Sequence, residues 1–111
     1  MGDLYTCDAY VCISEDIISY IKDGYCIDVE ESIKKNKKCT FCVVLKRDVV
    51  GIECKTIIAL EDNKNKTYTY HKKERVGKTK WKDEARVFSF DYDLGCYTFD
   101  NPEECYGRRR S

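Results

Sequence analysis

The chain has 111 residues, with 20 lysine and arginine side chains against 20 aspartate and glutamate side chains. This length predicts one domain over residues 1–111, with a thin core. The balanced charge excludes any inference about a charged partner from composition alone. No apolar run approaches the length of a membrane span, so we expect no membrane partner.

Eight residues are cysteines, a density typical of small secreted domains that supplement a thin core with disulfides. We therefore expect structural cysteines and a secreted protein. Met1-Gly2-Asp3 lacks the charged and apolar regions of a signal peptide. We interpret Met1 as a start residue on a mature chain whose leader has been removed. Pairing of Cys12 with Cys26 is one guess, and most other pairings stay open.

The first predicted elements are a short extended pair and a helix. Residues 4–12 have the pattern of two short extended segments around a turn near Asp8. Ser14 is a good N-cap for a helix, and the apolar face of that helix would consist of Ile17, Ile18 and Ile21. Either the helix ends at Gly24, or it continues past Gly24 because the apolar face extends beyond that residue. In both cases the predicted helical region covers roughly residues 14–35.

After Lys38 the pattern changes to strands, because β-branched and aromatic residues become frequent and alternate with polar ones. Strands are predicted at residues 40–45, 49–54, 56–60, 67–70, 85–90 and 96–99. Residues 61–66 are predicted to form a turn and residues 91–95 a hairpin connection. A helix followed by strands with short connections predicts an α+β fold, with one helix packed on a central antiparallel sheet.

Short motifs near both ends of the chain resemble those of the fungal guanyl-preferring ribonucleases. The opening Leu-Tyr-Thr-Cys at 4–7, followed by Cys12 and a helix starting at Ser14, is similar to the start of those enzymes. Residues 85–90, Ala-Arg-Val-Phe-Ser-Phe, resemble their Arg-Val-Val-Phe strand, and Cys105 resembles their terminal cysteine. The resemblance implies a ribonuclease-like fold, stapled by a disulfide between Cys7 and Cys105.

The chain is more similar to a second family with this frame, the RNase-like secreted effectors of powdery mildew fungi. These effectors open with Tyr-x-Cys, keep the ribonuclease fold and lack its catalytic residues. The enzymes use a glutamate and two histidines with an arginine, whereas this chain has one histidine, His71. Arg86 matches the arginine but cannot transfer protons at neutral pH, and we expect it to pair with acids such as Asp83 or Glu84. We therefore expect neither enzymatic activity nor a cofactor.

A zinc site is an alternative use of the cysteines. Cys39 and Cys42 form a Cys-x-x-Cys pair, to which Cys54 and His71 would add two ligands. The second pair of ligands is not close in sequence, so we favour structural disulfides and predict no metal. A redox role is disfavoured because the pair lies in a predicted strand and not at a helix N-terminus.

A basic, tyrosine-containing hairpin is the candidate binding surface. From Asp62 to Lys82, eight lysine and arginine residues stand against two acids. Such a surface favours protein or RNA binding, because tyrosine, tryptophan and arginine anchor protein interfaces and aromatic rings stack on bases. Its residues are Tyr68, Tyr70, Lys72, Lys73, Arg75, Lys78, Lys80, Trp81 and Lys82.

The resemblance implies the function that we expect. The chain would be a monomeric, catalytically inactive effector that is secreted, is delivered into host cells, and binds a host protein such as an immune receptor, with RNA as a second partner. Two other classes stay open. One is an active guanyl-preferring ribonuclease, and the other is a disulfide-rich secreted inhibitor or toxin of unrelated fold.

Overall fold

The computed structural model describes residues 8–38 and 40–100, which form two helices and a six-stranded antiparallel sheet. The α+β prediction is confirmed. No helix within these ranges is long and apolar enough to cross a membrane. The elements are α1 (Ala9–Lys22), β1 (Cys26–Ile27), α2 (Val29–Asn36), β2 (Phe41–Val49), β3 (Ile52–Asp62), β4 (Thr67–Val76), β5 (Lys82–Asp91) and β6 (Cys96–Phe99).

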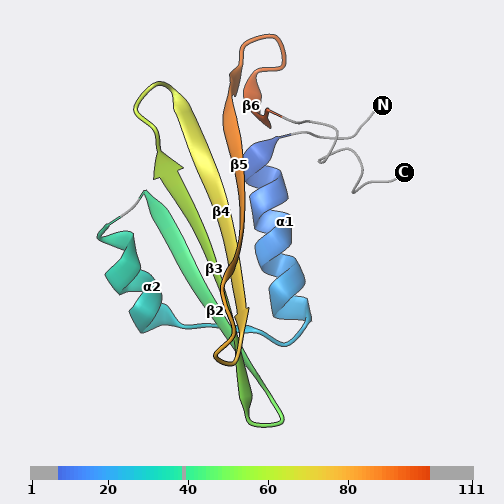
Figure 1. The fold of residues 1–111 in the computed structure, drawn as a ribbon. Helices are drawn as coiled ribbons and strands as arrows, with labels where there is room; N and C mark the ends of the chain where they lie inside the picture. Colours follow the sequence, from blue (N-terminus) through green and yellow to red (C-terminus); the bar gives the residue numbers. More distant parts are fainter. Residues whose placement is uncertain (1–7, 39, 101–111) are drawn as a thin grey trace.

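The sheet is a meander in which strands β1 to β6 lie in chain order and every neighbouring pair is antiparallel. Figure 1 shows α1 and α2 on opposite sides of this sheet. We call the face opposite α1 the open face. The prediction of a single helix is wrong, because the helical region is interrupted at Gly24. That glycine has a φ of 96°, a left-handed conformation that ends α1 and that glycine adopts without strain.

The core lies between α1 and the sheet. Residues three or four apart on α1 point inward, as expected for an amphipathic helix, and the buried ones are Ala9, Cys12 and Ile13. They pack in one cluster with buried sheet residues that include Leu45, Ile58, Leu60, Tyr70, Phe88 and Phe99. Burial of this apolar surface is the main force that holds α1 on the sheet.

Helix α1 begins earlier than predicted. Its N-cap is Asp8, whose carboxylate accepts hydrogen bonds from the backbone N–H groups of Tyr10 and Val11. The predicted N-cap, Ser14, therefore lies inside the helix, and residues 9–12 are helical where an extended segment was predicted. This start sets which side faces the sheet, so Ile18 and Ile21 are exposed although the apolar pattern predicted them inside.

Helix α2 covers the outer edge of β2. The side-chain amide of Asn36 accepts a hydrogen bond from the Cys42 N–H at 3.0 Å and donates one to the Cys42 carbonyl at 2.6 Å. The Ser32 hydroxyl accepts a hydrogen bond from the Val44 N–H at 2.8 Å. These side chains take the place of a neighbouring strand, so the edge of β2 is not open to pairing with another chain.

Strands β3 and β4 are longer than predicted. The segments 49–54 and 56–60 were predicted as two strands, but residues 52–54 and all of 56–60 lie in one strand, β3, which follows a two-residue turn at Val50–Gly51. Strand β4 continues beyond its predicted end at Tyr70 to Val76. Its added half carries Glu74, which accepts a hydrogen bond from the Tyr20 hydroxyl. The charged residue therefore has a polar partner on the face that α1 covers.

Two cysteines of the described ranges, Cys26 and Cys54, do not form the disulfides that we expected. Cys26 is exposed and Cys54 is buried, and both have free thiols. The guessed pairing of Cys12 with Cys26 is wrong. The thiol of Cys26 is free, so it has no disulfide partner. Cys7, Cys39 and Cys105 lie outside the described residues.

Candidate binding surfaces

The register of β4 divides the predicted binding surface between the two faces of the sheet. Successive strand residues point to opposite faces. Tyr68, Tyr70 and Lys72 pair across the sheet with residues of the face that α1 covers, whereas Lys73 and Arg75 lie on the open face. The nine residues therefore do not form one surface.

The two tyrosines of the predicted surface belong to the core side. Tyr70 is 3% exposed, and its hydroxyl donates a 2.7 Å hydrogen bond to the Asp16 carboxylate. Burial, and then the negative charge of Asp16, raise the pKa of the Tyr70 hydroxyl. Tyr68 stacks on Phe88 with ring centres 5.4 Å apart. Prediction of these rings as partner contacts is therefore wrong, because they complete the packing of the core.

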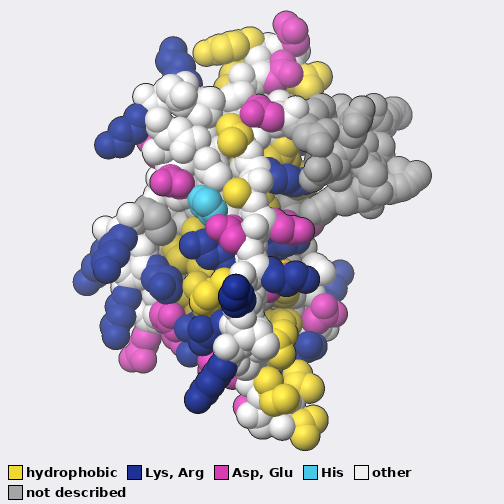
Figure 2. Space-filling view, in the orientation of Figure 1, with side chains coloured by type: hydrophobic (Ala, Val, Ile, Leu, Met, Phe, Trp, Pro, Cys, Tyr) yellow, Lys and Arg dark blue, Asp and Glu magenta, His cyan; other side chains and the backbone are white. Residues whose placement is uncertain are grey.

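Five other residues of the predicted surface lie near the end of the molecule where the β2–β3 hairpin projects (Figure 1): Arg75, Lys78, Lys80, Trp81 and Lys82. Figure 2 shows apolar side chains gathered at this end, below basic ones. The connection from β4 to β5 lies beside the hairpin, because the Gly77 N–H donates a 2.7 Å hydrogen bond to the Glu53 carbonyl. We call this region the distal surface. Its exposed members are Val49, Val50, Ile52, Val76, Lys78, Lys80 and Trp81.

Val50 is the most unusual residue of the distal surface. It is 96% exposed and has a φ of 52°, a left-handed conformation. With Gly51, it forms the two-residue connection of the β2–β3 hairpin, a position that favours asparagine, aspartate or glycine. A β-branched side chain in this conformation is strained and gains nothing from burial. The apolar run Val49-Val50-Gly51-Ile52 at a turn was the sequence signal for this surface, and our sequence analysis missed it.

Cations of the β4–β5 connection lie beside the apolar tip, whose own strands carry the exposed acids Asp48 and Glu53. Arg75 lies over the Trp81 ring, with the guanidinium carbon 4.9 Å from the ring centre. Lys78 and Lys80 are exposed and form no ion pair with any residue in the described ranges. Trp and Arg are frequent anchors of protein interfaces. The distal surface therefore combines apolar area, an aromatic anchor and unpaired positive charge.

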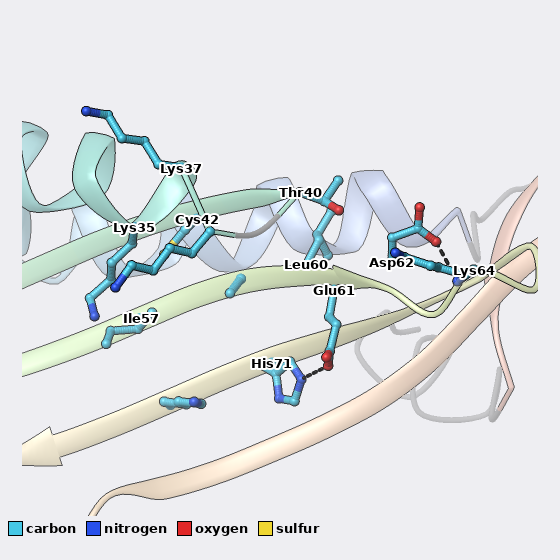
Figure 3. Close-up of a pocket in the computed structure, with 13 residues that line it drawn as sticks. Lys35, Lys37, Thr40, Cys42, Ile57, Leu60, Glu61, Asp62, Lys64 and His71 are labelled. Atoms are coloured by element: carbon cyan, nitrogen blue, oxygen red, sulfur yellow. Dashed lines mark hydrogen bonds and ion pairs between the residues drawn. The ribbon is translucent and has the colours of Figure 1, made fainter.

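A second feature is a groove of about 820 Å³ on the open face, between the C-terminal end of α2, the sheet and the β3–β4 turn. Ile57 and Ala59 are among the β3 residues that line it, and Figure 3 shows Lys35 reaching toward Ile57 while Lys37 points away. We call it the lysine groove, because its lining includes Lys35, Lys37, Lys38, Lys64 and Lys73.

The lysines of the open face fall into two groups. Lys46 lies 2.9 Å from the Asp28 carboxylate, and Lys55 lies 2.9 Å from that of Glu31. A hydrogen bond from Lys46 lowers the pKa of Asp28, and one from Lys55 lowers the pKa of Glu31. In the lysine groove, by contrast, Lys37, Lys38, Lys64 and Lys73 form no ion pair with any described residue.

His71 lies on the wall of the lysine groove. Its Nε2 atom lies 3.2 Å from a Glu61 carboxylate oxygen, and its Nδ1 atom lies 3.4 Å from one of Asp83. Figure 3 shows the contact with Glu61. The ring therefore lies between two acids on the strands that flank β4.

The structure separates the residues on which catalysis or zinc binding would depend. Arg86 lies on the α1 side, with its guanidinium carbon 3.9 Å from the Phe99 ring centre, and His71 lies on the open face. Cys54 faces α1, whereas Cys42 and His71 face the other way. Among residues 8–38 and 40–100, no group of three histidine, cysteine or acidic side chains could hold a metal ion.

Comparison of the chain with protein-family models, with curated proteins and with solved structures finds no match.

Proposed function

We propose that this protein is a catalytically inactive, ribonuclease-like secreted effector that binds a host plant protein, such as an immune receptor, through its distal surface. The observation that carries the proposal is Val50, a strained and almost fully exposed apolar residue at the tip of a projecting hairpin. Strain of this kind persists where a function requires it. Insertion of the tip into an apolar pocket of a partner would give Val50 the burial that it lacks in the free protein.

The arrangement of the elements supports the ribonuclease-like part of the proposal. The resemblance implies a helix followed by antiparallel strands, with that helix packed on the sheet, and α1 packs on one face of the sheet. The family assignment itself rests on the motifs at the two ends of the chain, of which residues 4–7 and Cys105 lie outside the described residues.

The positions of Arg86 and His71 support a role in binding and not in catalysis. Cleavage of RNA by a 2′-hydroxyl needs a general base, a general acid and a cation around one phosphate. Arg86 and His71 lie on opposite faces of the sheet, so they cannot act on the same phosphate. Incubation with RNA that contains all four bases should give no cleavage. Guanine-biased cleavage that is lost in Arg86→Ala would contradict the proposal.

Binding to the host protein is tested with two substitutions at the hairpin tip. Val50→Lys places a charge where an apolar contact is proposed, and Val50→Asn removes the apolar side chain but suits the turn. Proteins recovered from host plant extract on the immobilised chain are purified, and their direct affinity is measured by calorimetry. Both variants should weaken the affinity of a true partner by roughly tenfold or more.

The control is Val29→Lys, which adds the same charge at an exposed valine on α2. It should change the affinity by less than about twofold, because surface charges outside an interface contribute little. Val50→Asn should also raise the unfolding free energy by about 1 kcal/mol, since it relieves the left-handed valine. The proposal is wrong if every direct partner binds Val50→Asn as tightly as it binds the unchanged protein.

A further inference from the structure

We propose that the lysine groove is a binding site for a small compound that carries several clustered phosphate groups. This site is separate from the distal surface, because Lys64 lies in the β3–β4 turn and Val50 in the β2–β3 turn, at the two ends of β3. Binding of such a compound in the lysine groove would be a second function, independent of the binding of a host protein at the distal surface.

The first argument is that positive charge is concentrated in the groove without partners. Lys46 and Lys55 lie beside the groove on the same face, and each forms an ion pair with an acid of α2 or its N-cap. Other lysines on this face of the sheet are therefore neutralised by acids of the protein. Lys64 and Lys73 lie on different elements and line one concave space without an ion pair from the described part of the chain. Lysine ammonium groups around a hollow bind phosphate as point charges.

The second argument concerns the acids of the groove. Glu61 contacts His71, and Asp62 accepts a 2.8 Å hydrogen bond from the Lys64 backbone N–H. Asp83, on β5, is the cross-strand neighbour of Lys73 and lies 3.4 Å from the second nitrogen of His71. Each acid that faces the site therefore lies within hydrogen-bond distance of a nitrogen atom of the protein. Lysines still outnumber the carboxylates that line the groove by five to two, so its field attracts anions.

The third argument selects clustered phosphates over a nucleic acid. Proteins that bind single-stranded nucleic acids stack the bases on aromatic side chains. The described residues that line the groove include no phenylalanine, tyrosine or tryptophan, and its wall offers Ile57, Ala59 and Thr40. The site therefore provides charge for phosphates and no platform for bases. A compact polyphosphate fits this combination, because its charge is dense and it has no base to stack.

The experiment uses the whole chain and inorganic tripolyphosphate as the probe. Calorimetry should show binding that weakens as salt rises, since exposed charges are screened. Backbone amide signals of Ala59 and His71 in NMR spectra should shift on addition of the probe. The double variant Lys64→Gln with Lys73→Gln removes two charges without placing a new acid beside Asp83. It should lower the affinity by roughly tenfold.

The matched control is Lys78→Gln with Lys80→Gln, which removes the same charge from the distal surface. It should leave the affinity within about twofold, because these lysines are remote from the groove. The proposal fails if tripolyphosphate does not bind, if both double variants weaken binding equally, or if the shifts occur away from the groove. It also fails if a mixed-sequence RNA of equal charge binds more tightly and loses affinity in the groove variant, since the ligand would then be a nucleic acid.

Discussion

The hydroxyl of Tyr70 in β4 donates a 2.7 Å hydrogen bond to the carboxylate of Asp16 in α1. These two residues join the helix to the middle of the sheet by a polar contact inside an otherwise apolar interface. Burial raises the pKa of the Tyr70 hydroxyl, so it remains a proton donor at all ordinary pH values. Together with the hydrogen bond from Tyr20 to Glu74, the contact fixes the position of α1 along the strands.

Replacement of Tyr70 by phenylalanine should lower the free energy of unfolding by about 1.5 kcal/mol, the contribution typical of a hydrogen bond to a charged acceptor. The ring stays in place, so the loss measures the hydroxyl alone. Chemical denaturation measures it. The matched control, Tyr92→Phe, changes an 81% exposed tyrosine and should alter stability by less than about 0.5 kcal/mol. Equal effects of the two changes would contradict the structural role of the Tyr70 hydroxyl.

Asn36→Ala should destabilise the protein by about 2 kcal/mol, because it removes both hydrogen bonds to the Cys42 backbone at the edge of β2. The freed edge should also promote self-association, which light scattering detects. Asn36→Asp retains the acceptor for the N–H group, so its effect should be smaller. Lys34→Ala, at an exposed position of the same helix, is the control and should leave scattering unchanged.

Stability should fall on acidification because of Asp28 and Glu31. Their ordinary pKa values are 3.8 and 4.5, and hydrogen bonds from Lys46 and Lys55 lower both in the folded protein. The stabilisation is therefore complete above the ordinary values and is lost as the pH falls through the folded values. Urea unfolding at several pH values measures this slope. Lys46→Gln with Lys55→Gln should flatten it, and an unchanged slope would show that other acids cause the acid dependence.

The native protein should react with a thiol reagent at Cys26 and not at Cys54. Both thiols are free, but only the first is exposed. Cys54 should react after unfolding in urea, and peptide mapping by mass spectrometry distinguishes the two sites. The same map tests the Cys7–Cys105 bond that the resemblance implies, which would stabilise the fold by about 4–5 kcal/mol in the chain-entropy model. Recovery of Cys26 in a disulfide would contradict the structure.

The order of the elements was largely predictable from the sequence, because a helix and antiparallel hairpins depend on residues that are close along the chain. The apolar pattern around Ile17 and the turn between Asp91 and Gly95 are local signals of this kind. The helix start was predicted wrongly, because Asp8 and Ser14 are both good N-caps and packing of Ala9 and Cys12 in the core decides between them.

Which side chains face a partner was decided by tertiary structure. Strand alternation by itself places Tyr68 and Tyr70 on one face, but only the docking of α1 determines that this face is buried. Lys35, Lys64 and Lys73 are far apart in the chain and line one groove because α2, a turn and β4 meet there. Local composition determined the secondary structure and the amount of charge. The strand register, and the face of the sheet on which each helix packs, decided where that charge is available for binding.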